Sequence, residues 1–142
     1  MKKTPKRESI KKLKARAWVS FSRYIRLRDC LITTGSPEYG ECITCDRQLP
    51  FSQLQAGHFV ADRHNANLFS ERGVHAQCVS CNCYHGGRPL EYRRQIIRLY
   101  GEGVDEELEA EAKSIKKYTT YDLEELIKYY QEQIEKLGGV EK

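Results

Sequence analysis

The chain has 142 residues, of which 39% are hydrophobic and 31% charged, and it contains six cysteines. This length supports one modest hydrophobic core rather than two. No apolar run approaches the roughly 18 residues needed to cross a bilayer, and the first residues are charged with no hydrophobic segment behind them. We therefore expect neither a membrane span nor a secretory signal. In the reducing cytoplasm that we expect instead, clustered cysteines more often bind a metal than form disulfides.

The net charge of +4 conceals a strong segregation along the chain. Residues 1–28 carry a net charge of +10, residues 29–100 a net charge of 0, and residues 101–142 a net charge of −6. A segment with such an excess of positive charge suits a phosphate backbone, because binding there releases counterions. From charge alone, a solubilising basic tail remains the alternative.

The apolar residues near the amino terminus predict an amphipathic helix over residues 9–32. They recur at three- and four-residue steps, and they include Leu13, Ala17, Phe21 and Tyr24. Basic residues lie off this apolar stripe, so the helix can pack by one face and offer cationic groups to phosphates on another. The candidate phosphate-binding residues on this helix are Lys11, Lys12, Lys14, Arg16, Arg23 and Arg26.

The middle of the chain is rich in turn-forming residues. The pattern over residues 42–59 predicts a turn-rich hairpin, with a short strand over residues 55–60. Residues 61–73 are polar and predict a surface loop with a short strand at Leu68 and Phe69. A short helix is expected to follow over residues 78–86.

Three further features predict helices in the last part of the chain. Pro89 can occupy the first turn of a helix that ends at Gly101, and an acidic helix follows over residues 104–115. The last helix is the clearest, because its apolar residues step by four, three, four and three after a threonine cap. These residues are Leu123, Ile127, Tyr130, Ile134 and Leu137. Such a stripe more often packs on its own domain than against a second copy.

Two C-x2-C units form the sharpest motif in the sequence. Such units can place four thiolates around one tetrahedral zinc ion at about 2.3 Å each. The four predicted structural zinc ligands are Cys42, Cys45, Cys78 and Cys81. In a domain this small, a bound zinc would contribute directly to folding. Cys83 could replace Cys81 as a ligand, and Cys30 is interpreted as a small buried residue.

A histidine lies between these two units, and an asparagine follows the second one. His58 lies in a strand-like stretch, LQAGHFV, and Asn82 directly follows the second C-x2-C unit. A strand that turns back to a helix, both held by one zinc, would bring the two side chains face to face. This arrangement resembles the ββα-metal, or HNH, nuclease site, in which a strand histidine activates water and helix residues hold one divalent cation. The order C-x2-C, His, C-x2-C-N is similar to that of phage junction-resolving endonucleases.

The residues within these motifs resemble those of one family more closely. The strings QAGHF at residues 55–59 and HAQCVSCN at residues 75–82, followed by a helix ending in Tyr100 and Gly101, resemble the phage NinG or Rap recombination proteins. The resemblance covers roughly residues 8–137. It implies a metal-dependent, structure-specific endonuclease that cuts branched DNA such as Holliday junctions during phage recombination.

We therefore expect a small α+β protein with a zinc-stabilised ββα-metal core, HNH-like and treble-clef-like, flanked by N- and C-terminal helices. Its expected segments are a basic helical arm over residues 1–35, a zinc-bound nuclease core over residues 36–101 and an acidic helical region over residues 102–142. The expected partners are branched DNA and a second copy of the chain, because a nearly two-fold symmetric junction is cut on two strands. No small-molecule cofactor is expected.

His58 is the predicted general base. A neutral imidazole with an ordinary pKa of about 6.5 can take a proton from water at cellular pH. A catalytic Mg²⁺ or Mn²⁺ would stabilise the negative charge that develops at the phosphate, with Asn82 as an oxygen ligand. The alternative is that His58 is itself a ligand and another group is the base.

The second cation ligand is the open point of this hypothesis. Many HNH sites place Asp or His immediately before the base, but residue 57 of this chain is Gly57. His75, Asp62 or His64 could complete the site, and His75 is the preferred candidate. His64 and His85 are otherwise interpreted as solvated loop histidines.

The residues around the proposed site suggest how DNA could be held. Arg63, Arg72 and Arg88 could bind flanking phosphates in a bidentate manner, whereas Asn65 and Asn67 could fix the loop or only serve turn geometry. Two other functions remain open from the sequence: a non-catalytic zinc module that binds nucleic acid, and an HNH nuclease with little structural selectivity.

Overall fold

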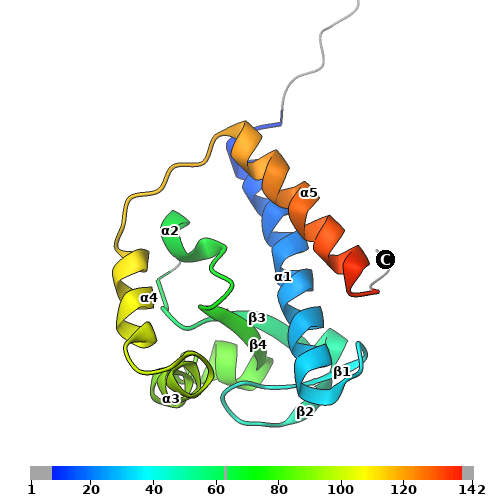
Figure 1. The fold of residues 1–142 in the computed structure, drawn as a ribbon, viewed down its shortest axis with the longest axis vertical. Coiled ribbons are helices and arrows are strands. Elements are labelled where there is room, and N and C mark those ends of the chain that lie inside the picture. The colour runs from blue at the N-terminus through cyan, green and yellow to red at the C-terminus, as the bar shows by residue number, and fades with distance from the viewer. Residues whose placement is uncertain (1–7, 63, 139–142) are drawn as a thin grey trace, which may run out of the picture.

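A computed structural model describes residues 8–62 and 64–138 of the chain. The mixed α+β class expected from the sequence is confirmed, and Figure 1 shows how the elements are arranged. The helices and strands are α1 (Ile10–Thr34), β1 (Tyr39–Glu41), β2 (Gln48–Pro50), β3 (Leu54–His58), α2 (Asn65–Leu68), β4 (Val74–Cys78), α3 (Pro89–Tyr100), α4 (Val104–Ala112) and α5 (Thr120–Lys136). A 3-10 turn, η1 (Phe51–Gln53), precedes β3, and a π-helical turn, η2 (Ser80–Tyr84), follows β4.

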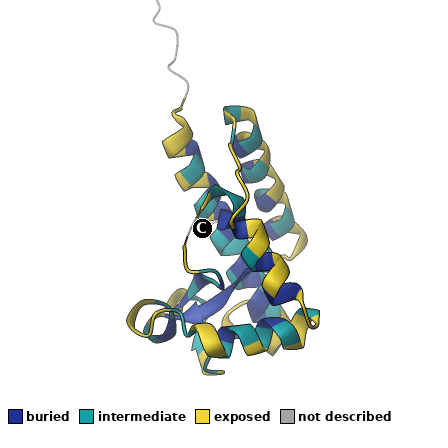
Figure 2. Ribbon diagram, turned by 90° about the vertical axis from the view of Figure 1, so that its left-hand side faces the viewer, coloured by how far each residue is buried: buried dark blue, intermediate teal, exposed yellow. Residues whose placement is uncertain are grey.

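The strands form two small antiparallel hairpins. β1 pairs with β2, and β3 pairs with β4 in a register that sets Gly57 opposite His75 and Gln55 opposite Gln77. Because side chains alternate across a strand, these four residues share one face of the β3–β4 hairpin. Every residue of β4 is buried, and Figure 2 shows buried strand residues in the interior with exposed residues on the helices and loops around them.

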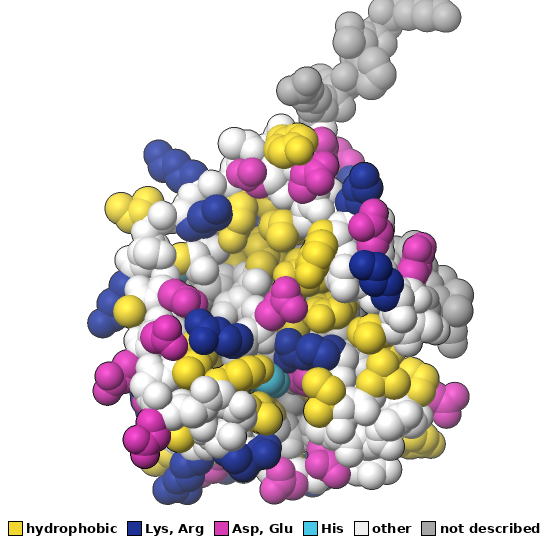
Figure 3. Space-filling view, in the orientation of Figure 1, with side chains coloured by type: hydrophobic (Ala, Val, Ile, Leu, Met, Phe, Trp, Pro, Cys, Tyr) yellow, Lys and Arg dark blue, Asp and Glu magenta, His cyan; other side chains and the backbone are white. Residues whose placement is uncertain are grey.

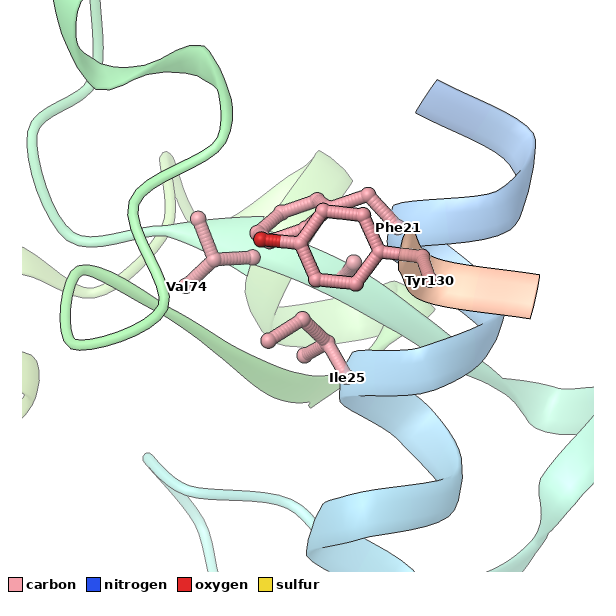
Figure 4. Packing of buried hydrophobic residues seen from close by; sticks show 5 residues of the cluster. Phe21, Ile25, Val74 and Tyr130 are labelled. Atoms are coloured by element: carbon pink, nitrogen blue, oxygen red, sulfur yellow. The ribbon is translucent and has the colours of Figure 1, made fainter. Parts of the chain in front are cut away.

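Helix α1 lies against the other face of this hairpin. Its predicted apolar stripe is confirmed, and Ser9 caps its first turn by accepting a hydrogen bond from the Lys12 N–H at 3.2 Å. The central cluster joins four elements (Figure 4) and consists of Phe21 and Ile25 from α1, Ala56 from β3, Val74 from β4 and Tyr130 from α5. Burying one side chain of this size stabilises the fold by about 1.5–3 kcal/mol.

Helix α5 runs alongside α1 (Figure 1). Thr119 and Asp122 form a reciprocal capping box at its start, as the threonine cap in the sequence predicts. Most of its predicted stripe is buried, namely Leu123, Ile127, Tyr130 and Ile134. Leu123 and Ile127 pack on the first turns of α1, so the expectation that this stripe packs on its own domain is confirmed.

Three elements differ from the sequence-based expectations. The short strand predicted at Leu68 is wrong, because Leu68 belongs to helix α2. Strand β4 was not anticipated, although its sequence VHAQC alternates apolar and polar residues, and its polar residues His75 and Gln77 are buried along with the apolar ones. The acidic helix predicted over residues 104–115 ends earlier, at Ala112, and Ile115 beyond it is 93% exposed.

Within the part of the chain that the structure describes, no helix combines the length and apolar character needed to span a membrane.

Candidate functional site

Four cysteines converge where the turn between β1 and β2 meets the end of β4 and η2. Their sulfur atoms all lie within 4.8 Å of one another, and Sγ of Cys45 and Sγ of Cys78 are 3.8 Å apart. A tetrahedral ion with Zn–S bonds of about 2.3 Å separates its sulfur ligands by about 3.8 Å. The cluster of Cys42, Cys45, Cys78 and Cys81 can therefore hold one metal ion.

Hydrogen-bond donors already surround these sulfur atoms. The Cys81 N–H donates to Sγ of Cys78 at 3.4 Å, and Nε of Arg88 donates to Sγ of Cys81 at 3.3 Å. The Thr44 hydroxyl lies 3.4 Å from Sγ of Cys42. Donors of this kind favour the thiolate, which is the form of cysteine that binds metals.

The pKa values of the clustered thiols show the effect of crowding. Burial alone would raise the pKa of Cys42, but the Thr44 hydroxyl and neighbouring backbone N–H groups bring it down to about 7. Burial and the adjacent Cys42 thiol raise the pKa of Cys45 to about 12. A bound cation is needed to keep all four sulfurs ionised, because neighbouring thiolates repel one another.

The other two cysteines lie outside this cluster. Cys83 is exposed and its sulfur donates to Oε1 of Gln55 at 3.3 Å. Cys30 is buried in α1, as the sequence predicts. Cys81, and not Cys83, therefore supplies the fourth sulfur.

His58 ends strand β3 with its ring held on two sides. The ring stacks on Trp18 of α1, with centroids 5.3 Å apart and planes 16° apart. Its Nε2 atom lies 3.1 Å from the carbonyl oxygen of Leu68. Because a carbonyl oxygen can only accept, Nε2 carries the proton, and Nδ1 is the basic nitrogen of the neutral ring. Trp18 and Leu68 thus fix the orientation and the tautomer of His58.

Asn67 of α2 holds the loop that follows His58. Its side-chain oxygen accepts from the His64 N–H at 2.8 Å, and its nitrogen donates to the carbonyls of Asp62 at 3.0 Å and Val60 at 3.4 Å. Since Leu68 is the next residue, these bonds also position the carbonyl that His58 contacts. The loop-fixing role that the sequence suggests for Asn67 is present in the structure.

The structure places His58 and Asn82 on a common cavity of about 200 Å³, between β3, η2 and the start of α3. Asn82 directly follows the metal-cluster residue Cys81, so that cluster positions it. Its Nδ2 donates to Oε1 of Gln55 at 2.8 Å. Its Oδ1 is turned toward Gly57, where a Cβ atom would lie 3.0 Å away.

Gln77 is a residue of this region that the sequence analysis missed. It is fully buried, and a Cβ atom on Gly57 would lie 1.9 Å from its Oε1. A glycine inside a strand often marks the close approach of another group, which was the available signal. Oxygen atoms of amide side chains are ligands for hard divalent cations. The oxygens of Gln77 and Asn82 beside Gly57 therefore suit such a cation.

His75 lies outside the residues that line this cavity. It is buried, with Nδ1 3.3 Å from Oδ2 of Asp29 and 3.2 Å from a guanidinium nitrogen of Arg28. Its Nε2 lies 3.1 Å from both the Tyr100 hydroxyl and the Arg72 carbonyl oxygen. Both ring nitrogens thus face protein groups, and His75 occupies a buried polar network that links α1, β4 and α3.

Asp29 is the acidic centre of that network. Burial opposes its ionisation, but the hydrogen bond and charge of His75 and the charge of Arg28 outweigh burial and keep the pKa of Asp29 below its ordinary value. Its Oδ2 also accepts from the Ala76 N–H at 2.7 Å. The network therefore ties α1 to the middle of β4.

The other candidate ligands are exposed, and the basic residues of α1 are exposed or partly buried. Asp62 and His64 are exposed in the loop after β3, and Lys11, Lys12 and Arg16 are exposed at the start of α1. Arg16 forms an ion pair with Glu8. Lys14 donates to Oδ1 of Asn65 at 2.8 Å, Arg23 is half-buried, and the Arg26 guanidinium stacks 4.6 Å from the centroid of Phe51.

The arginines predicted near the site have separate positions. Arg72 forms ion pairs with Glu107 and Glu111 of α4 at 3.6 and 3.2 Å. Arg88 donates to the metal cluster, and Arg63 lies outside the described residues. On the face of the molecule seen in Figure 3, lysine and arginine side chains are interspersed with acidic ones and do not form one continuous patch.

Comparison with known proteins gives the family. The family model described as "NinG: Bacteriophage Lambda NinG protein" matches residues 2–139. "Protein ninG" of Salmonella phage P22 is 32% identical over 97 residues, which are 68% of this chain and 47% of the P22 protein. "Protein ninG" of Escherichia phage lambda is 36% identical over 70 residues, which are 49% of this chain and 34% of the lambda protein. No solved structure matches the chain.

These matches confirm the resemblance that the spaced motifs indicate. The chain matches less than half the length of each of these two relatives. With the family model covering nearly all of its residues, the chain belongs to the NinG family of phage proteins.

Proposed function

We propose that this protein is a metal-dependent endonuclease that cuts branched DNA, such as Holliday junctions, in the cytoplasm of the host cell. The observation that carries the proposal is the shared cavity of His58 and Asn82, one side chain at the end of a strand and the other beside the four-cysteine cluster. The order of β3, β4 and η2, together with membership of the NinG family, supports the interpretation of this site as HNH-like.

The four cysteines hold a structural zinc ion in this proposal. An all-cysteine tetrahedral set is typical of structural zinc, because it leaves no open position for a substrate. The ion would join the β1–β2 turn to β4 and η2. A backbone hydrogen bond from the Ile43 N–H to the Ala76 carbonyl, at 2.9 Å, already connects this turn to β4. Zinc therefore sets the position of Asn82 relative to β3.

His58 acts as the general base. Its Nδ1 accepts a proton from the water that attacks the phosphorus, while Nε2 keeps its bond to the Leu68 carbonyl. The imidazolium that results is stabilised by that carbonyl and by the face of the Trp18 indole. A fixed ring loses no orientational freedom as the reaction proceeds, which lowers the barrier.

Asn82 holds the catalytic divalent cation through Oδ1. Mg²⁺ or Mn²⁺, when bound, supplies positive charge against the negative charge that develops on the phosphate oxygens and the leaving oxygen. Gln55 keeps the Asn82 amide oriented, because its oxygen accepts from Nδ2 and turns Oδ1 toward Gly57.

The exposed cationic residues at the start of α1, Lys11, Lys12 and Arg16, bind the phosphate backbone in this proposal. Two copies of the protein act on one junction, because two strands must be cut. The apolar stripe of α5 is buried within the protomer, so the contact between copies uses another surface.

A cleavage assay with the zinc-loaded protein tests the proposal. A labelled four-way junction and a linear duplex of the same sequence are incubated with Mg²⁺, with Mn²⁺ and with a chelator that leaves the zinc in place. We expect cutting of the junction only, dependent on Mg²⁺ or Mn²⁺, lost in Asn82→Ala and retained in the exposed control variant Gln53→Ala.

Two results would contradict parts of this account. Equal cutting of both substrates would make the protein a nuclease without selectivity for branches. Binding of DNA without cutting in any metal would leave a zinc-built DNA-binding module.

A further inference from the structure

Gln77 presents a buried oxygen with an unexplained environment. Its side chain is fully buried in β4, with Nε2 donating to the Gly87 carbonyl at 2.9 Å and to the Thr44 hydroxyl at 3.1 Å. Over residues 8–62 and 64–138, its Oε1 is the one buried side-chain polar atom without a hydrogen-bond partner. Leaving a buried polar atom without a partner destabilises the folded state, so such atoms are rare in folded proteins.

The orientation of this amide is fixed by its surroundings. The Gly87 carbonyl oxygen can only accept a hydrogen bond, so exchanging the nitrogen and oxygen of Gln77 would set two oxygens against each other. Oε1 therefore faces Gly57. In Asn82 the side-chain nitrogen donates to Oε1 of Gln55, and the side-chain oxygen likewise faces Gly57.

Gly57 makes this convergence possible. A Cβ atom at this position would lie 1.9 Å from Oε1 of Gln77 and 3.0 Å from Oδ1 of Asn82. The two oxygens are thus less than about 5 Å apart, within the span that two ligands of one divalent cation can have at about 2.0–2.6 Å each. The amide of Gln77 occupies the space that a side chain of residue 57 would take.

We propose that Oε1 of Gln77 and Oδ1 of Asn82 together bind the divalent cation of the site, and that residue 57 is glycine so that the Gln77 amide can reach it. This inference rests on the proposed function, which requires such a cation. It assigns the second ligand to β4 instead of to the residue that precedes His58.

The burial of Gln77 is compatible with this role. Mg²⁺ approaches its oxygen ligands to about 2.1 Å, whereas a water molecule stays at about 2.8 Å. An oxygen that solvent cannot reach is therefore still accessible to a small cation. Gly87 contacts the Gln77 amide and also lines the cavity that contains His58 and Asn82, so the path to the cavity is short.

The chemistry of this ligand pair predicts how the site behaves. Both ligands are neutral, and no Asp or Glu is among the described residues that line the cavity. A divalent cation held by neutral oxygens keeps most of its charge, and it binds more tightly when a DNA phosphate supplies a further, negatively charged ligand. Cation and DNA must then strengthen each other's binding by the same factor.

Mn²⁺ binding provides a test that does not depend on cleavage. The full chain, zinc-loaded and carrying His58→Ala so that DNA stays intact, is titrated with Mn²⁺ alone and with a four-way junction, following the electron paramagnetic resonance signal of free Mn²⁺. We expect one Mn²⁺ site, tighter with DNA, and a loss of affinity of about tenfold or more in Gln77→Ala.

Changes at Gly57 provide matched variants. Gly57→Ala should weaken Mn²⁺ binding although Gln77 is retained, because the new methyl group displaces its amide. Gly57→Asp combined with Gln77→Ala should restore binding, because a carboxylate then enters the vacated space. Zinc content and thermal unfolding confirm that each variant is folded.

A measurement on the protein without changes at Gln77 or Gly57 avoids any folding defect. Substoichiometric Mn²⁺ should broaden the side-chain NH₂ resonances of Gln77 and Asn82 in an ¹⁵N spectrum, while those of Gln131 and Gln133 on α5 stay sharp. Unchanged Gln77 resonances, or full Mn²⁺ affinity in Gln77→Ala, would overturn the inference and leave an oxygen that a buried water satisfies.

The outcomes separate this inference from the proposed function. Mg²⁺-dependent cutting of junctions without any effect of Gln77 on Mn²⁺ binding would keep the nuclease and remove Gln77 from the site. Gln77-dependent Mn²⁺ binding in a protein that cuts no DNA would keep the cation site and remove the nuclease.

Discussion

Nε2 of His58 lies 3.1 Å from the carbonyl oxygen of Leu68, a residue ten positions further along the chain. This bond makes Nδ1 the basic nitrogen, and it depends on helix α2, which presents the Leu68 carbonyl. The base of the proposed reaction is thus positioned by two elements: β3, which carries the ring, and α2, which fixes its tautomer. The loop between them is held by the side chain of Asn67.

Replacing Asn67 tests whether this loop supports the site. Asn67→Ala removes three hydrogen bonds of a buried side chain, so we expect the free energy of unfolding to fall by about 1–3 kcal/mol. We expect DNA cleavage to fall further than this stability change explains, while zinc content stays at one ion per chain. Asn65→Ala, which removes the side-chain bonds to Lys14 and Lys116 but leaves the three bonds of Asn67 intact, is the control. Equal activity of the two variants would argue against a positioning role for Asn67.

Zinc removal tests the metal cluster. Cys45→Ser should lose the zinc ion and the cooperative thermal transition, because metal binding in small zinc sites contributes on the order of 10 kcal/mol, comparable with the whole stability of a domain. Cys83→Ser should retain both, because Cys83 is exposed and outside the cluster. Zinc analysis and circular dichroism melting provide the readouts. A Cys45→Ser protein with full zinc content and an unchanged melt would refute the structural role.

The Asp29 network predicts an acid-dependent stability. The pKa of Asp29 is lower in the folded protein than the ordinary value of about 3.9, so its carboxylate stabilises the fold above that pH. This contribution is lost as the pH falls through the folded pKa. Asp29→Asn should reduce the free energy of unfolding by about 3 kcal/mol at pH 5, because it breaks a buried charged network.

The difference between the wild type and Asp29→Asn should shrink only below about pH 4. Urea unfolding at pH 5 and at steps below it, with zinc content measured at each step, gives this difference. A deficit that stays constant down to pH 3 in zinc-loaded protein would show that the Asp29 charge does not stabilise the fold.

The basic start of α1 predicts a salt-dependent affinity for DNA. Each phosphate contact contributes about 0.9 to the slope of log affinity against log salt concentration. Changing Lys11, Lys12 and Arg16 to Gln should therefore lower this slope by about 2–3. The control changes three lysines of the acidic region, Lys113, Lys117 and Lys128, which should leave the slope unchanged. Equal slopes for the first variant and the wild type would return this segment to the role of a solubilising tail.

The sequence identified the parts of the fold that depend on local patterns. The stripe of α5 and its Thr119 cap, and the stripe of α1, follow from residue spacing alone, and both helices are present with nearly the predicted bounds. The four clustered cysteines were found because a C-x2-C unit joins its two sulfurs through a short turn. Such features need no knowledge of the rest of the chain.

The parts that the sequence did not reveal depend on contacts between distant segments. Strand β4 alternates apolar and polar residues over only five positions, and its polar residues are buried by contacts with distant segments, which the alternation does not reveal. The sequence favours His75 as a cation ligand because of its place in the motif HAQCVSCN beside Cys78, but in three dimensions it faces Asp29 and Tyr100. The place of Gln77 beside Gly57 follows from the pairing of β3 with β4, which no single segment encodes.

The most direct test of the central claim compares two histidine variants in junction cleavage with Mg²⁺. His58→Ala removes the proposed base, and His85→Ala removes an exposed histidine that follows η2. We predict that both variants retain zinc and bind the junction, that His85→Ala cuts at the wild-type rate, and that His58→Ala is slower by about 10²–10⁴-fold. A folded, zinc-loaded His58→Ala protein that cuts as fast as the wild type would contradict the account.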